Sequence, residues 1–296
     1  FPYTTLFRSV SYINKVLGTE LSRSEMEKIF DRLGFTVDGS KDELIVTVPN
    51  RRWDISIPAD LVEEVGRIYG YDNLKSTQPL LAETHGGYSE KETAMRRIKD
   101  IVQGQGMMEA ISYSLTSPEK AISFTKDPKP VVEVQWPLNS SRSTMRENLL
   151  TGLVDAASYN MARKQKELAL FEQGRVYDHE NNTFNEHEHL AALYSGHTVS
   201  ANWQHLDQKI DFYFVKGQLT NLFRAIGIKD TDIEYRPEII VGMHPTRTAG
   251  IYLNDQYVGL IGMIAHTVTT LDKALRGSEI YGYEIDLDTI VSMLHK

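Results

Sequence analysis

The chain has 296 residues, and its 41% hydrophobic and 24% charged content is that of an ordinary globular protein with one large domain or two unequal ones. It has no cysteine, so disulfides, thiolate zinc sites and cysteine nucleophiles are excluded, and no apolar run approaches the roughly 20 residues of a membrane span. The formal net charge of −8 argues against a protein whose whole surface attracts nucleic acid. We expect a cytoplasmic protein.

Residues 1–9 are predicted to be a non-native leader. Their sequence, Phe-Pro-Tyr-Thr-Thr-Leu-Phe-Arg-Ser, is similar to the translation of a common sequencing adaptor, and it lacks the charged start and long apolar stretch of a secretory signal. We therefore expect this segment to pack poorly. A buried strand over residues 2–7 would count against that expectation.

A small module of three helices and a hairpin is predicted over residues 10–75. Ser22 and Glu25 have the spacing of a capping box, and apolar residues alternate on both sides of a turn at 38–40. The expected helices cover residues 12–18, 22–34 and 58–69, and the expected strands cover 35–37 and 44–48, the latter as an edge strand. Helix, helix, hairpin and helix in this order make a winged-helix-like outline.

That outline allows a nucleic-acid-binding protein as an alternative function. Residues 10–75 contain 9 Lys and Arg against 12 Asp and Glu, a local net charge of −3. A protein that reads duplex DNA normally presents a positive face to the phosphates. The charge therefore disfavours the alternative without excluding it.

Acidic residues gather around the third predicted helix. Asp60, Glu63 and Glu64 are spaced i, i+3 and i+4, so their carboxylates project from one helix face, and the preceding turn can fold Asp54 over the same face. Such carboxylates repel one another unless a cation lies among them, and Mg²⁺ prefers oxygen ligands of this kind. The spacing is thus compatible with a metal site or, as a free-standing enzyme, with a metal hydrolase.

An interpretation without metal fits the same spacing. Acidic residues in the first turns of a helix interact favourably with its positive end. Glu63 and Arg67 can form an i, i+4 ion pair, and Arg51 or Arg52 can neutralise Asp54. The spacing alone leaves both interpretations open.

Residues 76–89 are predicted to be a linker, because Pro79 and the pair Gly86-Gly87 interrupt the pattern. Residues 90–296 then form the second domain. The expected helices cover 89–105, 147–161 and 211–226, and the expected strands cover 109–116, 131–136, 169–177, 189–195, 233–235, 249–253, 257–264 and 279–285. Helices set between locally paired strands predict an α+β domain with a mainly antiparallel sheet.

Two long stretches in the first module resemble the bacterial phenylalanyl-tRNA synthetase beta subunit family. They are Pro49-Asn-Arg-Arg-Trp-Asp-Ile and Asp60-Leu-Val-Glu-Glu-Val-Gly-Arg-Ile-Tyr-Gly-Tyr-Asp. In the second domain, similar stretches are Met145-Arg-Glu-Asn-Leu-Leu-Thr-Gly-Leu-Val, Leu170-Phe-Glu-Gln-Gly-Arg-Val-Tyr, His244-Pro-Thr-Arg-Thr-Ala and Tyr281-Gly-Tyr-Glu-Ile-Asp-Leu. The resemblance covers about residues 10–287, with small departures at Thr151, Thr246 and Ala265-His266.

The resemblance implies a winged-helix-like module followed by a class II synthetase-like antiparallel-sheet domain without catalysis of its own. It implies that Asp54, Asp60, Glu63 and Glu64 bind a Mg²⁺ ion shared with an alpha subunit. The complete α₂β₂ assembly would use ATP in its alpha subunit to attach phenylalanine to tRNA(Phe). The chain would be an incomplete beta subunit, without the family's editing and anticodon-recognising modules.

The catalytic question depends on arginines, because a class II synthetase stabilises the transferring phosphoryl group with arginine and Mg²⁺. Arg175 lies in a faint echo of the strand that carries the first such arginine, whereas residues 258–267, the stretch expected to carry the second, contain none. Arg146 and Arg175 are therefore interpreted as structural or interface residues, and the chain alone is predicted to be inactive. The run at 186–189, Glu-His-Glu-His, is interpreted as a solvated strand start, because neighbours in a strand point to opposite faces.

Overall fold

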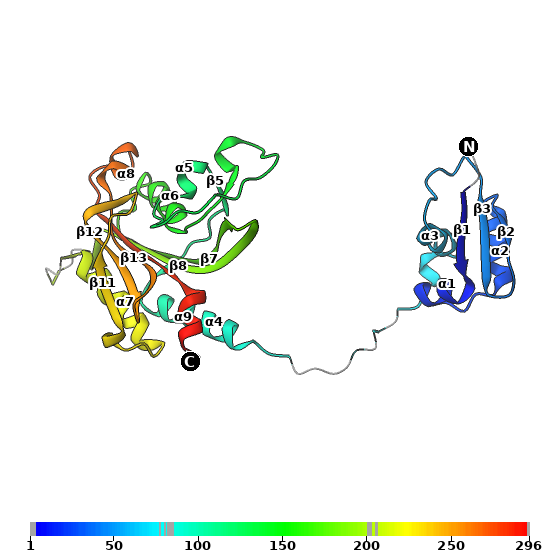
Figure 1. Cartoon of the computed structure of the whole chain (residues 1–296), viewed down its shortest axis with the longest axis horizontal. Helices are drawn as coiled ribbons and strands as arrows, with labels where there is room; N and C mark the ends of the chain where they lie inside the picture. The colour runs from blue at the N-terminus through cyan, green and yellow to red at the C-terminus, as the bar shows by residue number, and fades with distance from the viewer. Residues whose placement is uncertain are drawn as a thin grey trace. The chain divides into compact units, whose positions relative to one another are not determined.

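The computed structural model describes residues 4–76, 78–79, 81, 86–199, 203–204 and 207–294. The chain divides into two compact units, Phe1–His85 and Gly86–Lys296 (Figure 1). Each unit has its own hydrophobic core, so each is described by itself.

The first unit packs three helices against a three-stranded antiparallel sheet of order β1-β3-β2. Its elements are β1 (Thr4–Ser9), α1 (Val10–Leu17), α2 (Arg23–Arg32), β2 (Thr36–Asp38), β3 (Glu43–Val48), α3 (Pro58–Tyr69) and η1 (Tyr71–Asn73). The side chains of β3 point alternately to the two faces of the sheet. Leu44, Val46 and Val48 share one face and are buried in the same core as Phe30 of α2 and Leu61 of α3. The predicted capping box of Ser22 and Glu25 begins α2.

Two expectations about this unit are wrong. Thr4–Ser9 does not pack poorly: it forms β1, which pairs with β3 from Thr4 opposite Val48 to Ser9 opposite Glu43. Leu6 of β1 is buried in the core at 8% exposure. As a result β3 is the central strand of the sheet and not an edge strand. The expectation rested on the similarity of these residues to a translated adaptor, which says nothing about whether the segment can pair with β3.

The second unit is built on a seven-stranded sheet of order β11-β12-β13-β14-β8-β7-β4, antiparallel except for the parallel β4–β7 pair. Its helices are α4 (Glu90–Gly104), α5 (Pro118–Ala121), α6 (Leu150–Met161), α7 (Phe212–Ala225), α8 (His266–Leu271) and α9 (Leu287–Leu294). The strands of the sheet are β4 (Met108–Glu109), β7 (Leu168–Glu180), β8 (Thr183–Ser195), β11 (Ile233–Pro237), β12 (Met243–Leu253), β13 (Gln256–Ile264) and β14 (Ile280–Asp286). Smaller pairs are formed by β5 (Leu115–Thr116) with β6 (Thr144–Met145) and by β9 (His197–Val199) with β10 (Gln208–Lys209).

Helices cover both faces of the large sheet (Figure 1). Apolar side chains of α4, α7 and α9 share one core cluster with the strands, and those of α6 share the other. Both faces of β8 are therefore buried over Leu190–Leu193. This α+β architecture, with a mainly antiparallel sheet, agrees with the predicted class.

Some predicted elements of this unit differ from the structure. Residues 109–116 form only the ends of two short strands, and 131–136 contribute a single bridge from Glu133 to Thr144. The helix expected from residue 147 begins at Leu150, because the Glu284 carboxylate accepts hydrogen bonds from the backbone N–H groups of Leu149 and Leu150 at 2.9 to 3.0 Å. No helix among the described residues is both long enough and apolar enough to cross a lipid bilayer.

Candidate functional site

The four acidic residues proposed as metal ligands are positioned by α3 and by the turn before it. α3 begins at Pro58, which suits the first turn because its missing N–H has no helical partner there. Asp60 closes this start: its Oδ2 atom accepts hydrogen bonds from the backbone N–H groups of Ser56 at 2.7 Å and Ile57 at 2.8 Å. Its carboxylate thus caps the helix.

Arg52 lies between two of the other carboxylates. Its Nη2 atom is 2.7 Å from Asp54 Oδ2, and its Nη1 atom is 3.1 Å from Glu64 Oε2. Arg67 approaches Glu64 from the same helix, with Nη2 2.6 Å from Oε2. Glu64 is only 4% exposed, whereas Glu63 points to solvent. A guanidinium group therefore occupies the position where the spacing predicted a cation.

The ionisation of these groups follows from their partners. The Arg52 guanidinium lowers the pKa of Asp54 below its ordinary value. Burial alone would raise the pKa of Glu64, but hydrogen bonds from Arg52 and Arg67 outweigh it, so the net shift is downward. Both carboxylates are thus held in the charged form by arginine.

The structure does not bring the four acids together around one point. Asp54 and Glu64 meet on Arg52, Asp60 caps α3, and Glu63 is exposed. Within the described ranges, no group of three or more His, Asp or Glu side chains could hold a metal ion. In the chain by itself the four carboxylates therefore do not converge, because Arg52 supplies the counter-charge to Asp54 and Glu64. The role of these four residues as Mg²⁺ ligands stays a prediction.

Arg146 of the second unit is a buried structural residue. Its Nη1 atom is 2.6 Å from Glu172 Oε1 and 2.9 Å from Ser112 Oγ, and its Nε donates to the Arg175 carbonyl at 2.9 Å. Arg146 is 7% exposed and Glu172 is 2% exposed. The guanidinium joins β7 to the segments before α5 and α6, and these three contacts are all with residues of this chain.

Arg175 lies on the surface of β7, opposite Glu188 of β8. Its side chain is 58% exposed and pairs with Glu186 at 2.6 Å and Glu188 at 3.0 Å. Strands β13 and β14 both lead directly into a helix, α8 and α9, and neither strand nor its helix contains an arginine. The stretch expected to carry a second arginine therefore holds none, and Arg175 is paired with carboxylates of β8.

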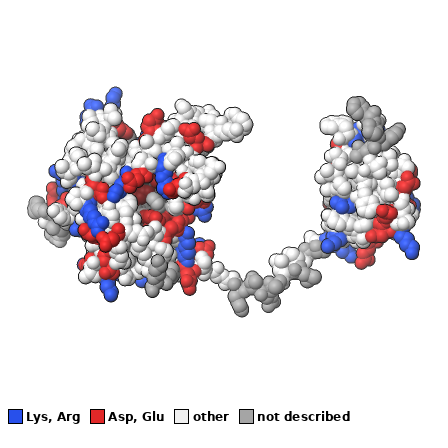
Figure 2. Space-filling view, viewed as in Figure 1, with Lys and Arg blue, Asp and Glu red and all other residues white. Residues whose placement is uncertain are grey.

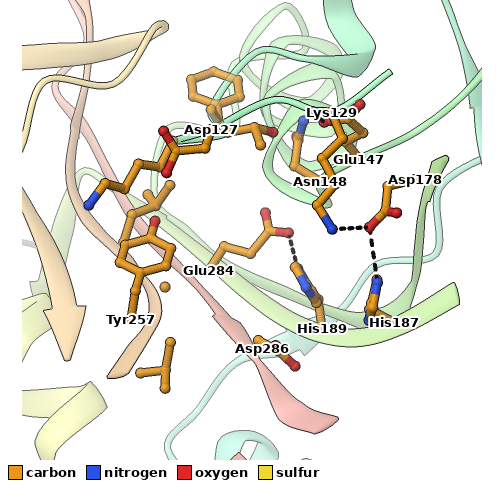
Figure 3. A pocket seen from close by; sticks show the side chains of 16 residues that line it. Asp127, Lys129, Glu147, Asn148, Asp178, His187, His189, Tyr257, Glu284 and Asp286 are labelled. Atoms are coloured by element: carbon orange, nitrogen blue, oxygen red, sulfur yellow. Dashed lines mark hydrogen bonds and ion pairs between the residues drawn. The ribbon is translucent and has the colours of Figure 1, made fainter. Parts of the chain in front are cut away.

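A cavity of about 340 Å³ opens on one face of the large sheet, and the sequence interpretation missed it (Figure 3). It is lined by residues of β7, β8, β13 and β14, and by residues 124–127, 129 and 147–148. His187 contacts Asp178 at 3.0 Å, and His189 contacts Glu284 at 2.8 Å. Figure 2 shows acidic and basic side chains gathered around a hollow on the visible face of this unit.

The histidines of the 186–189 run are therefore not a simple solvated strand start. His187 and His189 face the cavity, and Glu186 and Glu188 bind Arg175 on the other face of β8. Burial lowers the pKa of His189, but the Glu284 carboxylate outweighs it and the net shift is upward. Alternation in a strand predicted the two faces, but it could not predict a partner on β14 about a hundred residues later.

Comparison with known proteins assigns both units. The family model described as "tRNA synthetase B5 domain" matches residues 7–71. The family model described as "Phenylalanyl tRNA synthetase beta chain CLM domain" matches residues 74–287. Together they cover nearly the whole chain, in the order that the sequence motifs predicted.

Individual relatives agree. The chain is 92% identical to the phenylalanine–tRNA ligase beta subunit of Lactobacillus johnsonii over 288 residues, which is 97% of this chain and 36% of the relative. It is 40% identical to the beta subunit of Streptococcus pyogenes serotype M1, over 97% of this chain and 36% of that protein. The chain thus spans about a third of the length of the curated relatives it matches.

A solved pyrrolysyl-tRNA synthetase from Desulfitobacterium hafniense has a similar fold, with a TM-score of 0.50 at 15% identity over 69% of this chain and 68% of that one. This likeness concerns the fold alone. The family models and the identities to beta subunits carry the assignment, and they do not support the nucleic-acid-binding alternative. The chain belongs to the phenylalanine–tRNA ligase beta subunit family.

Proposed function

We propose that this chain is the scaffold portion of a phenylalanine–tRNA ligase beta subunit and supports chemistry performed by an alpha subunit. The match of residues 74–287 to the beta-chain family carries this proposal. In the complete α₂β₂ assembly, in the cytoplasm, ATP would activate phenylalanine for attachment to tRNA(Phe). The winged-helix-like module and the class II synthetase-like domain would provide a surface for the alpha subunit, and this part of the beta subunit would not hold tRNA strongly by itself.

The arginine contacts support a non-catalytic role for the second unit. Arg146 pairs with Glu172 and Ser112, and Arg175 pairs with Glu186 and Glu188. A phosphoryl-transfer site needs cationic donors that are free to meet developing charge in the transition state. Neither arginine is free in this sense, so we assign both to structure.

The test combines binding with chemistry. The purified chain should show no phenylalanine-dependent exchange of pyrophosphate into ATP, whereas a bacterial alpha subunit should co-purify with it. Exchange activity in the chain alone would refute the non-catalytic role. Failure of several bacterial alpha subunits to co-purify would refute the scaffold role.

We also propose that Asp54, Asp60, Glu63 and Glu64 bind Mg²⁺ at the joint with the alpha subunit. Because Arg52 neutralises two of these acids in the chain alone, the proposal requires that Arg52 be displaced when the joint forms. Bound Mg²⁺ would neutralise the carboxylates and so strengthen the joint.

Glu63 offers the cleanest test of the metal, because it is exposed and neither caps α3 nor holds Arg52. We expect Glu63→Gln to weaken association with alpha in Mg²⁺ and to leave association in chelator unchanged. Glu20→Gln, another exposed acid of the same unit, is the matched control and should behave as wild type. If wild type associates with alpha equally well with and without Mg²⁺, the proposed Mg²⁺ site is refuted and the acidic residues serve only to cap the helix.

A further inference from the structure

The two outer strands of the large sheet differ in how their free edges are protected. At one end, β11 carries Glu234 and Arg236, which pair with each other, and it ends in Pro237, which has no backbone N–H for a further strand. Charged residues and proline on an outer strand are common means of preventing edge-to-edge association. At the other end, residues 110–113, which follow β4, contain no charged residue and no proline.

The segment after β4 leaves one side of its backbone open. The N–H groups of Ala110 and Ser112 donate to β7, to a backbone carbonyl at 2.7 Å and to the Glu172 carboxylate at 3.2 Å. The N–H groups of Ile111 and Tyr113 donate to no backbone carbonyl in the described part of the chain. Because N–H groups alternate between the two sides of a strand, these two point away from β7, toward a partner that the chain itself does not supply.

The side chains along this edge are apolar and exposed. Met108, at the start of β4, is 59% exposed, Ile111 is 86% exposed and Tyr113 is 73% exposed. Ile111 and Tyr113 also line a groove of about 670 Å³ together with Tyr159 of α6. Exposed apolar side chains beside unpaired backbone groups mark a place where another strand can be added. We call residues 109–113 the open edge.

The charges beside the open edge fit a second copy of the same chain. The Arg142 guanidinium lies over the Tyr113 ring at 3.7 Å and pairs with no carboxylate among the described residues. Glu109 is exposed at the backbone edge, and its carboxylate contacts Lys99 at 2.6 Å. In an antiparallel pair centred on Ile111, Tyr113 of one copy lies opposite Glu109 of the other. Each Arg142 guanidinium therefore comes near a carboxylate of the other copy, and two-fold symmetry makes this contact twice.

We infer that two copies of this chain associate through the open edge, which pairs with itself as an antiparallel strand centred on Ile111. In this register the outward N–H groups of Ile111 and Tyr113 each meet a backbone carbonyl of the other copy. The exposed side chains of the two edges then pack against each other across the symmetry axis. The pairing is short, so the dissociation constant is about 10 µM, at the weak end for protein interfaces.

Sedimentation equilibrium of the chain alone measures this association. We expect a mass of twice 33.7 kDa to dominate at about 100 µM and the monomer to dominate at about 1 µM. Ile111→Lys places like charges opposite each other at the centre of the pair and should weaken association by about tenfold or more. Leu271→Lys is the matched control, because Leu271 lies on α8 and is 87% exposed, and it should associate as wild type does.

Single cysteines test the register, because the chain has no cysteine of its own. Opposite residues in an antiparallel pair have Cα atoms about 4.5–5.5 Å apart, which is within the range of a disulfide. Under mild oxidation, Ile111→Cys should therefore form a covalent dimer, and a mixture of Glu109→Cys with Tyr113→Cys should form the mixed dimer. Leu271→Cys, which is exposed to the same degree, should remain monomeric.

Three results would overturn the inference: a monomer at about 100 µM, association of Ile111→Lys within about twofold of wild type, or cross-linking of Ile111→Cys no faster than that of Leu271→Cys. Ile111 and Leu271 are exposed, and circular dichroism of each variant checks its fold. The experiments use the chain without an alpha subunit. Their failure is therefore distinct from a failure of alpha to co-purify.

Discussion

The Arg146–Glu172 pair provides the sharpest test of the structural role assigned to the arginines. Replacing Arg146 by Met keeps much of the side-chain volume and removes the guanidinium. Glu172, 2% exposed, then keeps only the N–H and hydroxyl of Ser112 as partners, at 3.2 and 2.6 Å, and the Arg175 carbonyl loses its donor. The variant therefore buries a carboxylate without its counter-charge.

Breaking a buried ion pair by removing one partner costs about 3–5 kcal/mol. Because Ser112 still donates twice to Glu172, we expect the lower end, about 3 kcal/mol. For a domain of this size, 1 kcal/mol shifts the melting temperature by about 2–4 °C, so the expected decrease is roughly 6–12 °C. Adding Glu172→Gln to Arg146→Met should recover part of the loss, since no charge is then left buried.

Urea unfolding followed by circular dichroism measures this free energy. Arg175→Met is the matched control: the same substitution removes two carboxylate partners, but at a side chain that is 58% exposed, and should cost less than about 1 kcal/mol. Equal costs for the two variants, or a cost below 1 kcal/mol for Arg146→Met, would refute the reasoning.

Three further predictions concern single residues. Asp60→Ala removes the cap of α3 and should lower the free energy of unfolding by about 1 kcal/mol in urea titration, whereas Glu63→Ala on the same helix should change it by less than about 0.5 kcal/mol. The pKa of Glu147 is raised to about 7 from 4.5, so its contribution to stability is complete below pH 4.5 and is lost as pH rises through 7. The free energy of unfolding of Glu147→Gln, measured relative to wild type, should therefore be about 2 kcal/mol higher at pH 8 than at pH 5. An unchanged difference between the two pH values would contradict the raised pKa. Gly259→Ala should unfold or severely destabilise the second unit, because φ is +153° and a Cβ would lie 2.1 Å from the Glu284 carbonyl oxygen. Gly104→Ala, in α4 where the space is open, should melt at or slightly above the wild-type temperature, because Ala favours a helix over Gly.

Local signals predicted local structure well. The bounds of α3 and the capping box of α2 follow from residues within one or two helical turns, and both are confirmed. The alternation at 109–116 was misleading, because Ile111 and Tyr113 are 86% and 73% exposed and lie in an irregular segment between β4 and β5. Alternation reports that a segment can be a strand, but pairing depends on a partner elsewhere in the chain.

The candidate sites were harder to predict because they depend on distant partners. Spacing placed Asp60, Glu63 and Glu64 on α3 correctly, but it could not show that the turn would carry Arg52 to Glu64. The cavity depends on the antiparallel register of β8 with β14, which sets His189 opposite Asp286. The sequence of either strand by itself does not predict which residues of β8 and β14 lie opposite each other.

The strand Thr4–Ser9 has a consequence for any shortened or re-engineered form of the chain. Of the side chains that the structure describes in this strand, Leu6 is buried while Thr5 and Phe7 are exposed, so the strand is held to β3 mainly through the backbone. An extended segment of quite different sequence, with one apolar residue at the Leu6 position, could take its place. Deleting it would leave one edge of β3 without a partner strand, and an exposed edge of this kind can pair with a strand of a neighbouring molecule and so promote aggregation.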